Sequence, residues 1–159
     1  MKRKLFSIGY NGFSVQGFVA ALTESGVECV VDTRELPISR KKGFAKSALQ
    51  NHLHEAGIVY RHFRVLGSPR FDRREVRNTG DYATFFSRVR KHLATLEAMT
   101  ALQNVIEIAR IKTSCLMCCC PDWRFCHRSC VADAITKRTY FAVEHLERTV
   151  ERVIQRKVA

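Results

Sequence analysis

Short apolar segments rich in β-branched residues alternate along this chain with longer segments of helical periodicity. The predicted strands are Lys4–Tyr10, Val27–Asp32, Ile58–Phe63, Ser114–Met117 and Tyr140–Val143. The predicted helices are a segment between Ser14 and Gly26, then Ala45–Ala56, a segment from Asp81 toward Leu96, Leu102–Ala109, Cys126–Lys137, and a charged terminal segment from about Glu144. Strands joined by helical crossovers form mostly parallel sheets. We therefore expect an α/β fold, a sheet of about five strands with helices on both of its faces.

The segment Arg64–Gly80 shows neither the helical nor the strand periodicity of apolar residues. It is rich in arginine and contains two glycines and a proline, a composition typical of a long surface loop. We expect this loop to be exposed, with its arginines available to a polyanion. They are Arg64, Arg70, Arg73, Arg74 and Arg77.

The composition is that of one globular domain spanning residues 1–159. Hydrophobic residues make up 46% and charged residues 26% of the chain, and no apolar run approaches the roughly 20 residues of a membrane helix. Ser7, Gly9 and Tyr10 interrupt the apolar stretch that follows the basic start, so no secretory signal is predicted. We expect a cytoplasmic protein with reduced thiols, and the odd number of cysteines, seven, agrees with that expectation.

The chain carries a formal net charge of +12. Such an excess attracts polyanions, so nucleic acid or a nucleotide is the expected partner class. The alternative is that the charge belongs to an ordinary solvated surface.

Polar side chains follow three of the predicted strands. Tyr10 ends the first strand, Asp32 and Arg34 follow the second, and Cys118 follows the fourth. The carboxyl ends of parallel strands meet at one edge of the sheet, where ligands of such folds bind. We expect these residues to surround one cleft.

The Asp32-Thr33-Arg34 turn has two interpretations. Asp32 transfers protons while Arg34 binds a phosphate or carboxylate, or the two side chains form an ion pair that braces the loop. The basic segment that follows contains Arg40 and is able to close over an anion. Tyr10 either donates a hydrogen bond to a ligand or covers the edge of the core.

Six of the seven cysteines lie within sixteen residues. They are Cys115, Cys118, Cys119, Cys120, Cys126 and Cys130. In a first interpretation Cys118, Cys120 and Cys126, with His127 or Cys130, bind zinc or iron. Against it, the Cys115-Leu-Met-Cys118 pair straddles a strand end, and there is no second well-separated pair.

In a second interpretation one thiol is a nucleophile. Cys126 is predicted to open a helix, where the helix dipole, His127 and Arg128 lower the pKa of a thiol. The spacing from Cys118 to Arg124 is similar to that of phosphatase and rhodanese-like loops, but this segment has no glycine and contains Asp122.

In a third interpretation Arg128 and the backbone amides of the helix start bind an anion. The cysteines then act mostly as small buried hydrophobic residues, with Cys115, Cys119 and Cys130 as the best candidates for packing.

An ordered set of short motifs resembles the domain of unknown function 488 (DUF488) family, over residues 5 to about 146. The motifs are Ile8 to Tyr10, Val31 to Arg34, Pro37 with Ser39-Arg40, Gly57-Ile58 with Tyr60, Leu66-Gly67, and Cys118 eight residues before Cys126-His127-Arg128. The resemblance implies a compact α/β domain with a polar site at one edge of the sheet, and it implies no reaction. Members of the family typically carry Cys-x-Glu before Cys-His-Arg, and Cys120 stands at the glutamate position here.

The leading hypothesis is an enzyme, a cysteine-dependent or acid–base hydrolase or transferase that acts on a phosphate-bearing substrate such as a nucleotide or nucleic acid. Its expected catalytic residues are Asp32, Cys126 and His127. Its expected substrate-binding residues are Tyr10, Arg34, Arg40, Cys118 and Arg128. The alternative is a module without turnover that associates with nucleic acid and binds zinc or iron through Cys118, Cys120 and Cys126.

Overall fold

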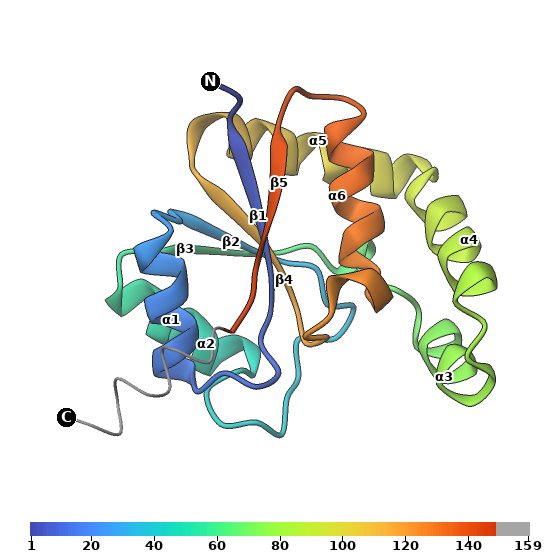
Figure 1. Cartoon of the computed structure of the whole chain (residues 1–159), viewed down its shortest axis with the longest axis horizontal. Coiled ribbons are helices and arrows are strands. Elements are labelled where there is room, and N and C mark those ends of the chain that lie inside the picture. The colour runs from blue at the N-terminus through green and yellow to red at the C-terminus, as the bar shows by residue number, and fades with distance from the viewer. Residues whose placement is uncertain (149–159) are drawn as a thin grey trace.

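The computed structural model describes residues 1–148, and within them five strands form one parallel sheet. Their order across the sheet is β3-β2-β4-β1-β5 (Figure 1). The strands are β1 (Lys4–Gly9), β2 (Cys29–Asp32), β3 (Val59–His62), β4 (Ser114–Cys118) and β5 (Ala142–Leu146). The predicted α/β fold with a parallel sheet is confirmed.

The strand register brings the ends of the strands together. Gly9 of β1 lies opposite Cys118 of β4, and Asp32 of β2 lies opposite Met117 of β4. Asp32 is also paired with His62 of β3. The residues that follow these strands therefore emerge side by side at one edge.

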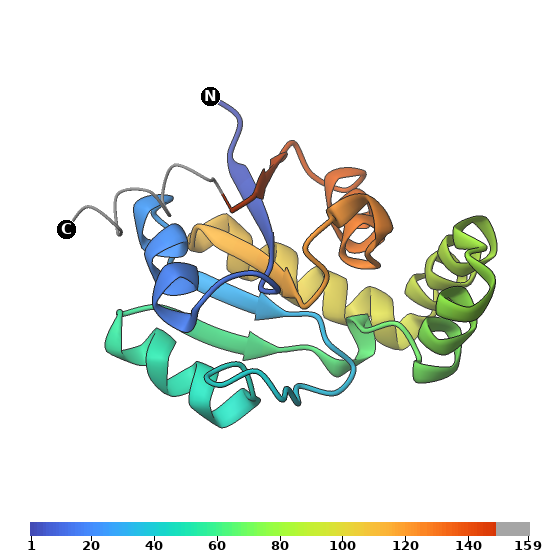
Figure 2. The ribbon, with the colours of Figure 1, turned by 60° about the horizontal axis from the view of Figure 1, so that its bottom comes forward.

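Helices cover both faces of the sheet, because neighbouring residues of each buried strand point to opposite sides. Val30 of β2 packs in the core formed with α1 (Val15–Glu24) and α2 (Lys46–Glu55). Cys29 and Val31 pack in the core of the other face. That core includes α4 (Tyr82–Leu93), α5 (Leu96–Ile111) and α6 (Arg128–Thr136), and Figures 1 and 2 show the two layers.

The prediction of a long loop over Arg64–Gly80 is wrong. A short 3-10 helix, η1 (Arg64–Leu66), is followed by the helix α3 (Arg70–Thr79). Val76 is its buried residue, and Gly80, with φ of 69°, ends the helix in the left-handed conformation that glycine adopts readily. The helix has one narrow buried stripe, which explains why apolar periodicity did not reveal it.

Two other helices begin at different residues from those predicted. Helix α5 starts at Leu96 and not near Leu102, because Thr95 caps it. Helix α6 starts at Arg128, and Cys126 instead follows a 3-10 helix, η2 (Trp123–Phe125). Cys126 therefore does not open a helix, and the predicted dipole effect on its thiol loses its basis.

The C-terminal prediction is also corrected in part. Glu144 to Leu146 belong to β5, which extends beyond the predicted strand, so no helix begins at Glu144. The remainder of the predicted terminal helix, residues 149–159, lies outside the described residues. Among the helices of residues 1–148, none is both long and apolar enough to cross a membrane.

Candidate functional site: a braced turn beside a thiol–histidine cluster

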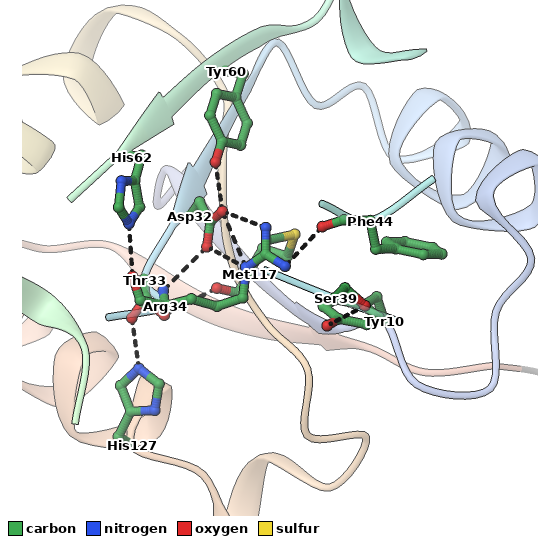
Figure 3. A network of polar contacts seen from close by, with 10 residues as sticks. All are labelled: Tyr10, Asp32, Thr33, Arg34, Ser39, Phe44, Tyr60, His62, Met117 and His127. Carbon is green, nitrogen blue, oxygen red and sulfur yellow. Dashed lines mark hydrogen bonds and ion pairs between the residues drawn. The ribbon is translucent and has the colours of Figure 1, made fainter. Parts of the chain in front are cut away.

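Asp32 and Arg34 form a buried ion pair at the end of β2. Their side chains are 0% and 5% exposed. The Nη2 of Arg34 donates to Oδ2 of Asp32 at 2.7 Å, and its Nε donates to Oδ1 at 2.9 Å (Figure 3). The backbone N–H of Arg34 also donates to Oδ1 at 3.0 Å. A two-pronged pair of this kind holds the turn in one conformation.

Groups from two other segments complete the pair. The Tyr60 hydroxyl donates to Oδ2 of Asp32 at 2.6 Å, and Nη1 of Arg34 donates to the carbonyl oxygen of Phe44 at 2.7 Å. Burial raises the pKa of Tyr60 above its ordinary value, and the hydrogen bond to Asp32 raises it further. Burial lowers the pKa of Arg34, but the bonds to Asp32 outweigh it and the net direction is upward. Each nitrogen of the guanidinium thus has a protein partner, in a geometry that matches a brace between β2, β3 and the Phe44 segment.

Tyr10 lies beneath the basic segment that follows this turn. Its ring stacks on Phe44 with centroids 4.4 Å apart, and the guanidinium carbon of Arg34 lies 5.4 Å from its ring centroid. The Tyr10 hydroxyl donates to Oγ of Ser39 at 3.2 Å. Tyr10 is 4% exposed and Arg40 is exposed. The tyrosine covers the core, and the arginine faces solvent.

The Thr33 carbonyl connects the turn to the cysteine segment. Thr33 itself is fixed to β4, because its N–H and its hydroxyl both donate to the carbonyl oxygen of Met117, at 3.0 and 2.9 Å. The Thr33 oxygen faces Nε2 of His127 at 2.8 Å (Figure 3). A carbonyl oxygen only accepts hydrogen bonds, so we assign the proton to Nε2. The other ring nitrogen, Nδ1, is left for the thiols.

Two sulfur atoms lie against that nitrogen. Nδ1 of His127 is 3.9 Å from Sγ of Cys118 and 3.8 Å from Sγ of Cys126. All three residues are buried, and their ligand atoms lie within 4.8 Å of one another. The thiols of Cys118, Cys119 and Cys120 form a second group within the same limit. Since Cys118 belongs to both groups, the five residues form one cluster.

The thiols perturb one another strongly. Hydrogen bonds from Cys119, Cys120 and Cys126 bring the pKa of Cys118 well below its ordinary value, against the effect of burial. The bond to Cys118 raises the pKa of Cys119 to about 11, and the pKa of Cys120 also rises. Burial lowers the pKa of His127, but the charges of Cys118 and Cys126 outweigh it and raise the pKa well above 6.5. Without a metal ion the cluster therefore favours a thiolate on Cys118 beside a protonated His127.

Strand β1 and Arg128 hold the cysteine segment in place. A Cβ on Gly9 would lie 1.7 Å from the carbonyl oxygen of Cys120, so only glycine lets the two backbones approach this closely. Arg128 is 1% exposed; its Nη1 donates to that same oxygen at 2.6 Å and its Nε donates to Oγ of Ser7 at 2.8 Å. In this geometry Arg128 positions the Cys120 backbone.

The structure brings most of the predicted site residues to one edge. Adjoining segments there carry Tyr10, Asp32, Arg34, Cys118, Cys126, His127 and Arg128. Arg40 is exposed and lies between β2 and α2. Cys115 and Cys130 are buried in the two cores, so the prediction that they pack is confirmed. Sequence reasoning missed the contributions of Ser7, Thr33, Phe44, Tyr60 and His62. Thr33 and Tyr60 had a signal, because both stand in the family motifs.

The fold and the cluster together define an α/β domain with thiol and imidazole groups gathered at the carboxyl edge of its sheet. The chain belongs to the family described as "Domain of unknown function DUF488", whose sequence profile matches residues 14–135. The resemblance inferred from the motifs is thereby confirmed. No curated protein and no solved structure gives a significant match to the chain.

Proposed function

We propose that this protein is a metal-binding protein whose centre is formed by Cys118, Cys120, Cys126 and His127. The observation that carries the proposal is the convergence of buried soft donors on one point, with Sγ of Cys118 and of Cys126 both beside Nδ1 of His127. Thiolates and imidazoles are the ligands that zinc prefers.

Two of the donor distances are close to those of a zinc site. A nitrogen at about 2.1 Å and a sulfur at about 2.3 Å from one ion, at the tetrahedral angle, lie roughly 3.6 Å apart. The two nitrogen–sulfur distances here are 3.8 and 3.9 Å. Both nitrogen–sulfur distances therefore need to shorten by only a few tenths of an ångström, and the two sulfur atoms lie within 4.8 Å of each other.

Cys120 supplies the fourth donor in this proposal. Sγ of Cys120 lies within 4.8 Å of Sγ of Cys118, in the group that also contains Cys119, and joining the site would bring it toward Cys126 and His127. Cys120 stands where the family typically has a glutamate, so this chain offers a third thiolate in place of a carboxylate. The resulting Cys₃His set is a common structural zinc site.

The hydrogen bond of His127 also supports a metal. Histidines that bind metals usually donate their second ring N–H to a carbonyl or carboxylate, which fixes the ring and its tautomer. Nε2 of His127 has such a partner in the Thr33 carbonyl, 2.8 Å away. Binding would displace protons from Nδ1 and from the thiols while Nε2 keeps its own.

Elemental analysis of the protein purified without chelator tests the proposal. We expect about one zinc or iron per chain, consistent with one tetrahedral set of ligands. The double variant C118S/C126S should lose the metal, while C130A, which changes a buried cysteine outside the cluster, should keep it. A metal-free wild-type protein after reconstitution with zinc, or a double variant that retains the metal, would overturn the proposal.

A second candidate function is favoured by the pKa directions in the cluster. A thiolate on Cys118 beside a protonated His127 is the arrangement of an activated cysteine nucleophile, as in a hydrolase or transferase. The candidate nucleophile is then Cys118, whose pKa is lowered, in place of Cys126, the candidate from the sequence.

For a phosphate-bearing substrate, the anion-binding part of this second candidate rests on Arg40. Arg34 and Arg128 already donate to protein oxygens, and the carboxylate of Asp32 accepts from Arg34 and Tyr60. Labelling with iodoacetamide separates the two functions. A nucleophile reacts with and without chelator, and a metal ligand reacts only after chelation.

A further inference from the structure

The charged side chains of α3 are sorted onto two faces. On the face toward α4, Asp72 and Glu75 both bind the guanidinium of Arg88, and Nη1 of Arg88 lies 3.2 Å from Oδ1 of Asp72. Val76 is buried on the same helix. The acidic residues of α3 are therefore engaged in holding the helix to α4.

The arginines of the opposite face are not neutralised. Arg70, Arg74 and Arg77 follow one another at spacings of four and three residues, which places them on one face of the helix, and all three are exposed. Within residues 1–148 none of these three arginines forms an ion pair. Arg77 donates a hydrogen bond from its Nε to the carbonyl oxygen of Arg73, which is uncharged. Arg73, by contrast, pairs with Glu35.

An exposed aromatic ring borders this basic face. Phe71 is 69% exposed, and the guanidinium carbon of Arg88 lies 5.9 Å from its ring centroid. Helices α3 and α4 stand out from the sheet at one end of the molecule (Figures 1 and 2). The basic face and the ring are thus presented together on a projecting element.

We propose that α3 binds single-stranded nucleic acid. Arg70, Arg74 and Arg77 span about 10 Å along the helix axis and contact successive phosphates, while the ring of Phe71 stacks on an unpaired base. Unpaired arginines beside an exposed aromatic residue are the chemistry that single strands select. The net charge of +12 increases the rate of encounter. The proposal does not depend on the metal centre.

Salt-dependent binding of a fluorescent oligo(dT) of about 16 nucleotides tests it. The triple variant R70Q/R74Q/R77Q should lower the slope of log affinity against log salt by about 2, since each phosphate contact on a single strand contributes about 0.7. The matched control K2Q/R110Q/K137Q removes the same charge from exposed positions elsewhere and should keep the slope.

The variant F71A distinguishes single strands from duplexes. It should weaken oligo(dT) binding by roughly 5- to 150-fold, the value of one stacked base, and leave the salt slope unchanged. Binding to a duplex of the same length should not change. All four proteins are first compared by circular dichroism and zinc content, so that loss of the fold or of the metal is recognised separately.

Three outcomes would overturn the proposal. The control triple variant loses as much of the slope as the α3 variant, or F71A binds oligo(dT) as tightly as the wild type does. The third is that the protein fails to bind oligo(dT) and instead binds anionic lipid vesicles or an acidic polypeptide through the same arginines.

Discussion

Two clusters of polar side chains, one around Asp32 and one around His127, lie next to each other at the carboxyl edge of the sheet. They differ in how completely their hydrogen-bonding atoms are paired. Around Asp32, one carboxylate meets one guanidinium and one hydroxyl, and each charged or strongly polar group has a well-placed partner. Around His127, thiols face one another and a ring nitrogen, and sulfur atoms are weak hydrogen-bond partners. The hydrogen bonds around Asp32 are complete without a ligand, whereas our proposal is that a metal ion, with loss of protons, stabilises the group around His127.

The comparison assigns different roles to the two groups. The brace around Asp32 fixes the turn whose middle residue, Thr33, presents its carbonyl to His127. We infer that the brace orients the cluster and takes no part in its chemistry. This division can be tested by changing each group and measuring both stability and metal content.

The largest effect on stability is expected for D32A. The substitution leaves the guanidinium of Arg34 buried without its carboxylate, and breaking a buried ion pair in this way costs about 3–5 kcal/mol. Urea denaturation monitored by circular dichroism measures this loss. A cost below about 1 kcal/mol, the value of an exposed pair, would show that Asp32 and Arg34 are not a structural brace.

G9A should remove the metal, although Gly9 is not a ligand. The added Cβ would overlap the carbonyl oxygen of Cys120 and displace the segment that carries the thiols. The matched control is G26A, where a left-handed φ of 71° makes alanine cost about 1–2 kcal/mol but no atom lies within 4 Å. Zinc analysis should separate the two variants, and equal zinc content in both would contradict the account.

In the metal-free protein, Cys118 should alkylate at lower pH than Cys130. Hydrogen bonds from neighbouring thiols lower the pKa of Cys118, whereas burial raises that of Cys130. The Cys118 thiolate therefore persists as the pH falls below about 8.5, where ordinary thiols become protonated. Peptide mapping after brief iodoacetamide treatment across a pH series measures both residues. The same pH profile of alkylation for the two cysteines would show that their pKa values do not differ as described. Added zinc should protect Cys118 from alkylation.

Y60F should have the smallest effect, a loss of about 1 kcal/mol, because Arg34 still neutralises Asp32 when the hydroxyl is removed. The folded protein raises the pKa of Tyr60 above 10.0, so the hydroxyl contributes its full stability below pH 10. That contribution is lost as the pH rises from there toward the folded-state pKa. Denaturation of wild type and Y60F at several pH values should give a constant difference below pH 10 that shrinks above it. A difference that grows with pH would contradict the assignment.

The sequence predicted the sheet well because buried parallel strands such as β2, with Cys29, Val30 and Val31, are short and mostly apolar. It failed for α3, whose buried stripe is narrow and whose clearest signal was Gly80 at its end. It placed Asp32, Arg34 and Cys118 at one edge because they follow the carboxyl ends of strands that were predicted to be parallel. It did not predict the hydrogen-bond partners of His127 and Arg128, because Thr33 and His127 are 94 residues apart and Ser7 and Arg128 are 121 apart. Contacts over such separations depend on the strand register, which the sequence does not specify.

X-ray absorption at the zinc edge tests the central claim, that the cluster and not the brace binds a ligand. We predict a first shell of about three sulfur atoms near 2.3 Å and one nitrogen near 2.0–2.1 Å, which corresponds to Cys118, Cys120, Cys126 and His127. Substitution of His127 by alanine should remove the nitrogen contribution, while Y60F should leave the spectrum unchanged. A shell made only of oxygen and nitrogen atoms, or a protein that binds no zinc, would contradict the account.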